Sequence, residues 1–77
     1  MDGRREIDLI IEGEDRRVIA IEVKLSDTIT DNDVRHLNWL RGEIGERLVE
    51  RVVVNTGPRA YRRANGVAVI PLALLGP

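Results

Sequence analysis

Three side chains in the first third of the sequence could form a site for metal-assisted chemistry. Asp8 lies in an apolar, β-branched run, and Glu22 and Lys24 lie in a second run of the same kind. Because side chains alternate along a strand, Glu22 and Lys24 share one face of the second run. Two carboxylates held close together repel each other unless a proton or a cation lies between them. A hard divalent cation such as Mg²⁺ suits that arrangement, and a neighbouring ammonium group can orient water or stabilise charge on a phosphoryl oxygen.

The pairing register of the two runs decides how close these groups lie. If Glu12 pairs with Val18, Asp8 stands directly opposite Glu22, at a Cβ separation of roughly 5 Å. If Asp8 pairs with Ala20 instead, Glu22 is its diagonal neighbour and the cluster persists. The spacing is therefore suited to metal-assisted hydrolysis of a phosphodiester. An ordinary Glu/Lys pair on a solvated sheet face has the same spacing.

These two runs are predicted to be the strands of an antiparallel hairpin. Residues 7–12 and 17–24 are rich in β-branched side chains, and they flank a polar turn that contains Gly13. This pattern is typical of a hairpin. A third, continuously apolar strand is predicted over residues 49–55, and its apolar character indicates a central place in the sheet.

One helix is predicted between the second and third strands. Thr30 and Asp33 have the spacing of a capping box, so we expect the helix to begin at residue 31 and to end at residue 42 or residue 45. A strand, a helix and a strand in succession imply parallel strands joined by a crossover. Four apolar residues form a single buried stripe on the helical wheel: Val34, Leu37, Leu40 and Ile44.

The segment after the third strand is predicted to form shorter elements. Asn65-Gly66 turns the chain into a last strand over residues 67–70, which Pro71 restricts to an edge or a short piece. Residues 72–75 are expected to form one helical turn. The predicted fold class is therefore α/β: a small mixed sheet, made of an antiparallel hairpin plus a parallel crossover strand, with one main helix.

Length and composition predict one small domain, residues 1–77. The chain has 77 residues, of which 43% are apolar and 32% charged. No apolar run approaches the ~20 residues that a membrane-spanning helix needs, and the first residues lack the apolar segment of a secretory signal. The absence of cysteine excludes disulfides and thiolate chemistry. We therefore expect a cytoplasmic protein with no membrane contact.

The charge distribution bears on the kind of partner. A net charge of −1 gives no global positive field that would attract nucleic acid. Lys24 is the single lysine among the twelve basic residues. Arg59, Arg62 and Arg63 form a short basic patch around Tyr61, which is suited to holding phosphates. A solvated loop explains the same patch.

The order of motifs and elements resembles the PD-(D/E)XK nuclease superfamily. Asp8 in the first run, followed by Glu22-Val23-Lys24 in the second, matches the D…ExK signature. The runs Ile-Ala-Ile-Glu-Val-Lys-Leu-Ser and Val-Ala-Val-Ile-Pro-Leu are similar to the C-terminal region of the DUF4143 family, in which a nuclease-like domain follows an AAA+-type ATPase module. The resemblance covers essentially the whole chain.

This resemblance implies a site and a cofactor. Asp8 and Glu22 would bind Mg²⁺, or Mn²⁺ as its substitute, together with the backbone carbonyl of Val23. Lys24 would orient the attacking water or stabilise the phosphate. The implied activity is metal-dependent hydrolysis of DNA or RNA. The alternative is a non-catalytic interaction or oligomerisation module that keeps the nuclease fold.

The sequence departs from the superfamily before the aspartate. The superfamily core begins with a helix and a strand that precede the strand carrying the aspartate, and the ATPase module has a glycine-rich nucleotide loop; the 77 residues contain neither. We therefore expect a truncated restriction endonuclease-like core, the C-terminal piece of a protein with an ATPase module. An unpaired sheet edge seeks partners, so a dimer or higher homo-oligomer that completes the sheet or covers its face is expected.

Overall fold

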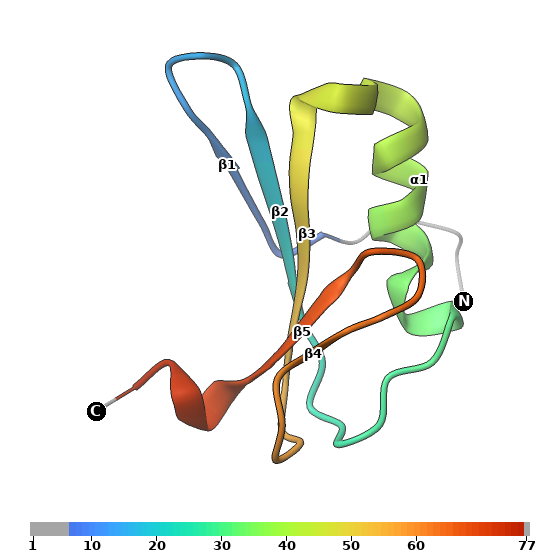
Figure 1. The fold of residues 1–77 in the computed structure, drawn as a ribbon, viewed down its shortest axis with the longest axis vertical. Coiled ribbons are helices and arrows are strands. Elements are labelled where there is room, and N and C mark those ends of the chain that lie inside the picture. The colour runs from blue at the N-terminus through green and yellow to red at the C-terminus, as the bar shows by residue number, and fades with distance from the viewer. Residues whose placement is uncertain (1–6, 77) are drawn as a thin grey trace.

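The computed structural model describes residues 7–76, so residues 1–6 and 77 of the predicted single domain lie outside it. The described residues form one five-stranded sheet with a helix on one side (Figure 1). The strands are β1 Leu9–Glu12, β2 Val18–Val23, β3 Leu48–Asn55, β4 Tyr61–Arg62 and β5 Ala68–Pro71. The helices are α1 Arg35–Ile44 and three 3₁₀ turns, η1 Asn32–Val34, η2 Gly45–Arg47 and η3 Leu72–Leu74.

The sheet is mixed, and β3 lies at its centre. The strand order is β1-β2-β3-β5-β4. β1 runs antiparallel to β2, β4 runs antiparallel to β5, and β2, β3 and β5 are parallel neighbours. The segment from β2 to β3 crosses over through η1 and α1 (Figure 1). The predicted α/β class, the hairpin, the parallel crossover and the central third strand are confirmed.

The hairpin has the register that brings Asp8 close to Glu22. Glu12 pairs with Val18, and this pairing continues to the beginning of β1. The chain bends at Asp8, so β1 is shorter than the predicted strand over residues 7–12. The bend has a physical cause, because the carboxylate of Asp8 accepts the backbone N–H of Val23 at the position where a strand carbonyl would otherwise pair.

The start of the helix is built as the sequence predicted. Asp33 accepts the N–H of Thr30 at 2.9 Å, and Thr30 Oγ1 accepts the N–H of Asp33 at 3.4 Å, which together form a capping box. The first turn is the 3₁₀ turn η1, and α1 continues to Ile44. The predicted apolar stripe packs on the sheet, with Val34 and Leu37 fully buried and Ile44 partly buried.

The end of the sheet differs from the prediction. Of the two alternatives for the last strand, an edge or a short piece, the structure has the second, because β5 is a strand of four residues that lies between β3 and β4. The sequence does not predict β4, because this strand has only two residues, Tyr61 and Arg62, and two residues show no apolar periodicity. Pro71 is tolerated because it lies beyond the two residues of β5 that pair with β4, where its missing N–H removes no bond to that strand. The predicted helical turn after it is confirmed as η3.

The two faces of the sheet have different surroundings. The face toward α1 holds the core: Val18, Ala20, Ile29, Val34, Leu37, Leu40, Leu48, Val53, Val67 and Val69. On the other face, alternate residues of β1 and β2 remain exposed or half-buried. Within residues 7–76, no helix has both the length and the apolar character required to cross a bilayer.

Candidate functional site

Glu22 is a buried carboxylate at the carboxyl end of β2. Strand alternation places it on the same face as Val18 and Ala20, which are both part of the core, so the residue is only 4% exposed. Its Oε2 lies 3.0 Å from Nζ of Lys24. Its Oε1 is buried and has no hydrogen-bond partner among the described residues. A buried oxygen without a hydrogen-bond partner lowers stability. A folded protein that keeps one therefore commonly binds a water molecule or an ion at that atom.

Lys24 lies at the boundary between this buried carboxylate and solvent. Its side chain is 36% exposed, whereas that of Glu22 is 5% exposed. The backbone N–H of Lys24 donates to the carbonyl of Val54 at 2.9 Å, which extends the ladder between β2 and β3 by one residue. The ladder therefore fixes the backbone of Lys24, and the ammonium group is held by Glu22 within reach of solvent.

Asp8 is attached to the peptide group between these two residues. Its Oδ2 accepts a hydrogen bond of 2.7 Å from the backbone N–H of Val23. Asp8 itself is exposed, and no hydrogen bond to its Oδ1 is found within residues 7–76. Asp8, Glu22 and Lys24, the three residues singled out from the sequence, are thus brought together at one end of the hairpin. The exposed Glu/Lys pair of the alternative interpretation does not match a glutamate that is 4% exposed.

Asn55 is a polar residue of this region that sequence reasoning did not select. It ends β3, the strand next to β2, and follows Val54, to which Lys24 is bonded. The residue is 1% exposed, and neither Oδ1 nor Nδ2 has a hydrogen-bond partner within the described chain. Carboxyl ends of parallel strands are where ligand sites form in open α/β sheets. A polar residue that ends a continuously apolar strand, as in Val52-Val53-Val54-Asn55, was the signal available in the sequence.

The donor set of this region offers a hard cation two carboxylates. Within residues 7–76 no three His, Cys, Asp or Glu side chains lie close enough together to hold a metal ion. A cation here would therefore depend on two carboxylates, Asp8 and Glu22, and on backbone or water oxygens. The unpartnered Oε1 of Glu22 is an oxygen ligand of the kind that Mg²⁺ prefers. The residues present fit such an ion on this ground.

The basic patch predicted around Tyr61 is largely engaged within the chain. Arg62 binds both carboxylate oxygens of Glu50, at 2.7 and 3.2 Å, and the carbonyl of Gly66 at 2.8 Å. This bidentate contact holds the pKa of Glu50 below its usual value of 4.5 and raises the pKa of Arg62.

The other two arginines of the patch differ in their contacts. Arg63 donates to the carbonyl of Ile29 at 2.7 Å and to the carboxylate of Asp31. Arg59 is exposed and makes no hydrogen bond or ion pair within residues 7–76. Binding of nucleic acid by Arg59, Arg62 and Arg63 stays a prediction, with Arg59 as the guanidinium group that is available to a ligand.

The fold and the site define a class of protein, a small mixed α/β domain with an acidic and basic cluster where a parallel strand ends. The family model described as "Domain of unknown function (DUF4143)" matches residues 1–75. The chain belongs to this family. No curated protein and no solved structure matches it.

Proposed function

We propose that the chain carries the hydrolytic site of a metal-dependent nuclease of the PD-(D/E)XK kind, which cleaves phosphodiester bonds of DNA or RNA. One observation carries the proposal. Glu22 is buried, with Oε2 on Lys24 and with no hydrogen-bond partner for Oε1 among residues 7–76, and Asp8 is bonded to the peptide group between Glu22 and Lys24. A solvated surface pair gives no reason to bury an unsatisfied carboxylate oxygen, whereas a ligand-binding site does.

The carboxylates of Asp8 and Glu22 and the carbonyl of Val23 are the oxygens that would hold Mg²⁺ or Mn²⁺. When bound, such an ion offsets the negative charge that develops on the phosphate during hydrolysis. Burial makes the position of Glu22 rigid, since its strand is paired on both sides. The hydrogen bond from Val23 to Oδ2 limits the rotation of the Asp8 carboxylate. Oδ1 is then the oxygen of Asp8 that would bind the ion.

Lys24 supplies a positive charge next to the reacting phosphate. Its ammonium group carries three N–H donors, of which Glu22 occupies one direction. The remaining donors are available to orient a water molecule or to bind a phosphoryl oxygen. Its partial exposure is what permits contact with a substrate as large as a nucleic acid.

The proposal involves two partners, a nucleic acid and an ATPase module. Arg59 lies in the loop that follows β3, the same end of the sheet at which Lys24 and Asn55 lie, and it would bind a phosphate of the nucleic acid. An ATPase module in the longer protein would act on the same nucleic acid.

A second candidate function is supported by a separate observation. On the face of the sheet away from α1, apolar residues of β1 and β2 are exposed, among them Leu9 at 51% and Ile11 at 46%. Exposed apolar surface of this kind marks interaction sites. A non-catalytic interaction module with this fold would use that face and would have no need of the Asp8–Glu22–Lys24 cluster.

The deciding experiment is a titration of the chain with Mg²⁺ and with Mn²⁺, followed by NMR and calorimetry, together with a nuclease assay on single-stranded and double-stranded DNA and RNA. We expect saturable metal binding that perturbs the backbone amides of residues 8 and 22–24. Asp8→Asn should abolish this binding while the fold is retained. Lys24→Ala should retain metal binding and lose hydrolysis, which separates the two roles.

Glu14→Gln is the matched control, because it removes an exposed carboxylate in the turn at the other end of the hairpin. Equal loss of binding in Asp8→Asn and Glu14→Gln would show that the metal binds through general surface charge. Absence of binding to the wild-type chain would leave the interaction module as the better interpretation.

A further inference from the structure

The face of the sheet opposite α1, here called the open face, is largely apolar. Pairing places Leu9 next to Ile21 and Val52, and Ile11 next to Ile19, all pointing to the side away from the core. Leu9, Ile11, Val23 and Val49 are each about half exposed, and the remaining members are half-buried. The open face consists of Leu9, Ile11, Ile19, Ile21, Val23, Val49, Val52 and Ile70.

Such a surface is unusual for these strands. β2, β3 and β5 are parallel neighbours, and parallel strands are normally buried on both faces. A sheet that faces water on one side shows polar residues there, whereas β2 has Ile19, Ile21 and Val23 at those positions. The side chains therefore suit a covered face, and no described helix covers it (Figure 1).

The charges on the open face identify the kind of partner. Glu50 and Arg62 also project to this side, and they bind each other across the small Ala68 at 2.7 Å. At the hairpin turn, Asp15 and Arg17 form a second internal pair at 2.5 Å. Within residues 7–76, the open face therefore presents one charge without an ion-pair partner, the exposed carboxylate of Glu14 in the hairpin turn. It offers no unpaired cation to the phosphates of a nucleic acid or to anionic lipid, and its apolar part meets a second copy without like-charge repulsion.

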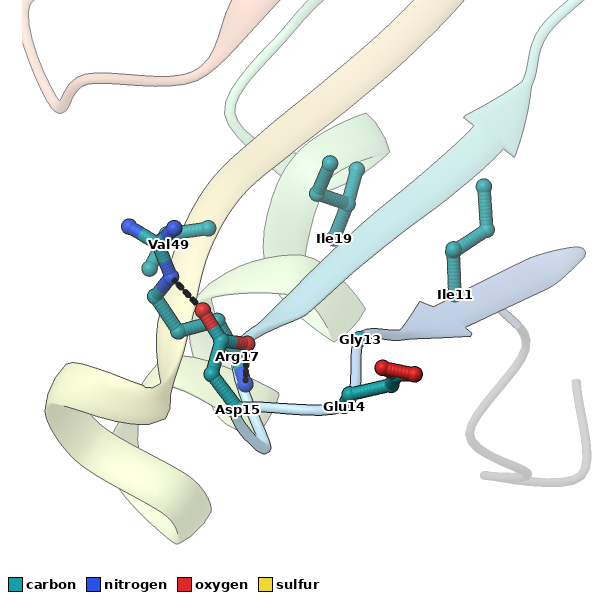
Figure 2. Close-up of a pocket in the computed structure, with 7 residues that line it drawn as sticks. All are labelled: Ile11, Gly13, Glu14, Asp15, Arg17, Ile19 and Val49. Atoms are coloured by element: carbon teal, nitrogen blue, oxygen red, sulfur yellow. Dashed lines mark hydrogen bonds and ion pairs between the residues drawn. The ribbon is translucent and has the colours of Figure 1, made fainter.

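The open face also has a shape that suits close packing. Toward the hairpin turn it deepens into a hollow of about 580 Å³, which Ile11, Ile19 and Val49 line together with the turn. Figure 2 shows Ile11 and Ile19 projecting to the same side from adjacent strands, with Asp15 and Arg17 paired at the rim. The open face is thus an apolar surface with a polar rim, which is the anatomy of a specific protein interface.

We propose that the open face is the interface of a homodimer in which two copies pack their sheets face to face around a two-fold axis. The exposed fractions correspond to on the order of 500 Å² of apolar surface per copy, so two copies would bury about 1,000 Å², the lower limit for a specific interface. Under two-fold symmetry the apolar part of the face packs against the same residues of the second copy and is complementary to itself. The proposal is independent of the hydrolytic site, which lies on the other face of the sheet, and it differs from pairing along the edge of β1.

The chain provides a closely matched pair of variants for the test. Ile10 and Ile11 are neighbours in the edge strand β1, with exposed fractions of 52% and 46%. Ile10 pairs with Ala20 and lies on the face of α1, whereas Ile11 pairs with Ile19 and lies on the open face. Glutamate at either position adds the same charge at a similar exposure. A difference in dimerisation between Ile11→Glu and Ile10→Glu therefore shows which face of β1 forms the interface, and it is not an effect of the added charge alone.

The experiment is sedimentation equilibrium of the full 77-residue chain over a wide concentration range, with circular dichroism to confirm that each variant folds. We expect the wild-type chain and Ile10→Glu to dimerise alike. Ile11→Glu should raise the dissociation constant about a hundredfold, because a two-fold axis introduces the charge twice into a desolvated interface. Val23→Glu, at the other end of the open face, should act in the same way.

Three results would overturn the proposal. A wild-type chain that stays monomeric at all concentrations would mean that a different molecule covers the open face. Equal weakening by Ile10→Glu and Ile11→Glu would indicate pairing along the edge of β1. A dimer that neither Ile11→Glu nor Val23→Glu weakens would place the interface on another surface.

Discussion

The backbone N–H of Val23 donates a hydrogen bond of 2.7 Å to Oδ2 of Asp8. This one contact joins a residue that precedes β1 to the last residue of β2, and it ends the regular pairing of the hairpin. It also places an exposed carboxylate beside the peptide group that separates Glu22 from Lys24. The architecture of the candidate site therefore depends on where the hairpin stops as much as on how it pairs.

The contact predicts that two substitutions of Asp8 differ in stability. Asp8→Asn keeps an oxygen that can accept the N–H of Val23, so its free energy of unfolding should stay within about 0.5 kcal/mol of wild type, whereas Asp8→Ala should lose about 1 kcal/mol. Urea unfolding followed by circular dichroism measures both. If asparagine costs as much as alanine, the carboxylate charge and not the hydrogen bond stabilises the end of the hairpin.

Removal of the lysine charge should destabilise the chain more than removal of an ordinary surface lysine. In Lys24→Met, the buried carboxylate of Glu22 loses its partner at 3.0 Å. We expect a loss of about 1–3 kcal/mol, reduced from the cost of a fully buried pair because Lys24 is partly exposed. The double variant Glu22→Gln, Lys24→Met should recover part of this loss in a double-mutant cycle.

Lys24→Arg is the control for this prediction, because it retains the charge and therefore most of the stability. Under the proposed function it should still reduce hydrolysis, since a planar guanidinium group does not reproduce the compact ammonium group. A Lys24→Met variant as stable as wild type would mean that solvent, and not Lys24, stabilises the carboxylate of Glu22.

Asn55 should contribute to function without contributing to stability. Both polar atoms of its side chain are buried and lack partners within the described residues, so Asn55→Leu, which has a similar shape, should be as stable as wild type or more stable. The same variant should weaken metal binding or hydrolysis if the amide belongs to the site, as stability is commonly sacrificed at active sites. Thermal unfolding and the metal titration are the two measurements. A large fall in stability with unchanged metal binding would assign Asn55 a purely structural role.

The ion pair between Glu50 and Arg62 predicts a specific dependence on pH. Arg62 lowers the pKa of Glu50 below 4.5, so the folded state binds fewer protons than the unfolded state near this pH. The pair therefore stabilises the fold fully above pH 4.5, and this contribution is lost as the pH falls through the lowered pKa. Because both side chains are partly exposed, solvent screens the pair and its contribution to stability is small.

Glu50→Gln tests this directly. Its free energy of unfolding should be lower than that of wild type at neutral pH, and the difference should shrink toward zero as the pH falls well below 4.5. Urea unfolding at a series of pH values gives both curves. A difference that is constant with pH would mean that packing, and not the charge of Glu50, accounts for the effect.

The sequence by itself determined most of the elements and the three residues of the candidate site. The alternation of side chains in residues 17–24 predicts β2 and the set of residues that share each of its faces. The spacing of Thr30 and Asp33 predicts the start of the helix. The D…ExK spacing gives Asp8, Glu22 and Lys24 as neighbours. These inferences depend on local periodicity and on side-chain hydrogen bonds within a few residues, which is information that a single segment carries.

Only the tertiary structure decided which surfaces these elements cover. Periodicity cannot tell whether an apolar strand is buried on one face or on two, so the exposed side chains of Leu9, Ile11 and Val23 on the open face were not foreseen. The two-residue strand β4 forms because β5 is already in place to pair with it. The burial of Glu22 and Asn55 likewise results from contacts with elements that are distant in the sequence. The solvent exposure of a side chain depends on what packs over it and not on the segment that carries it.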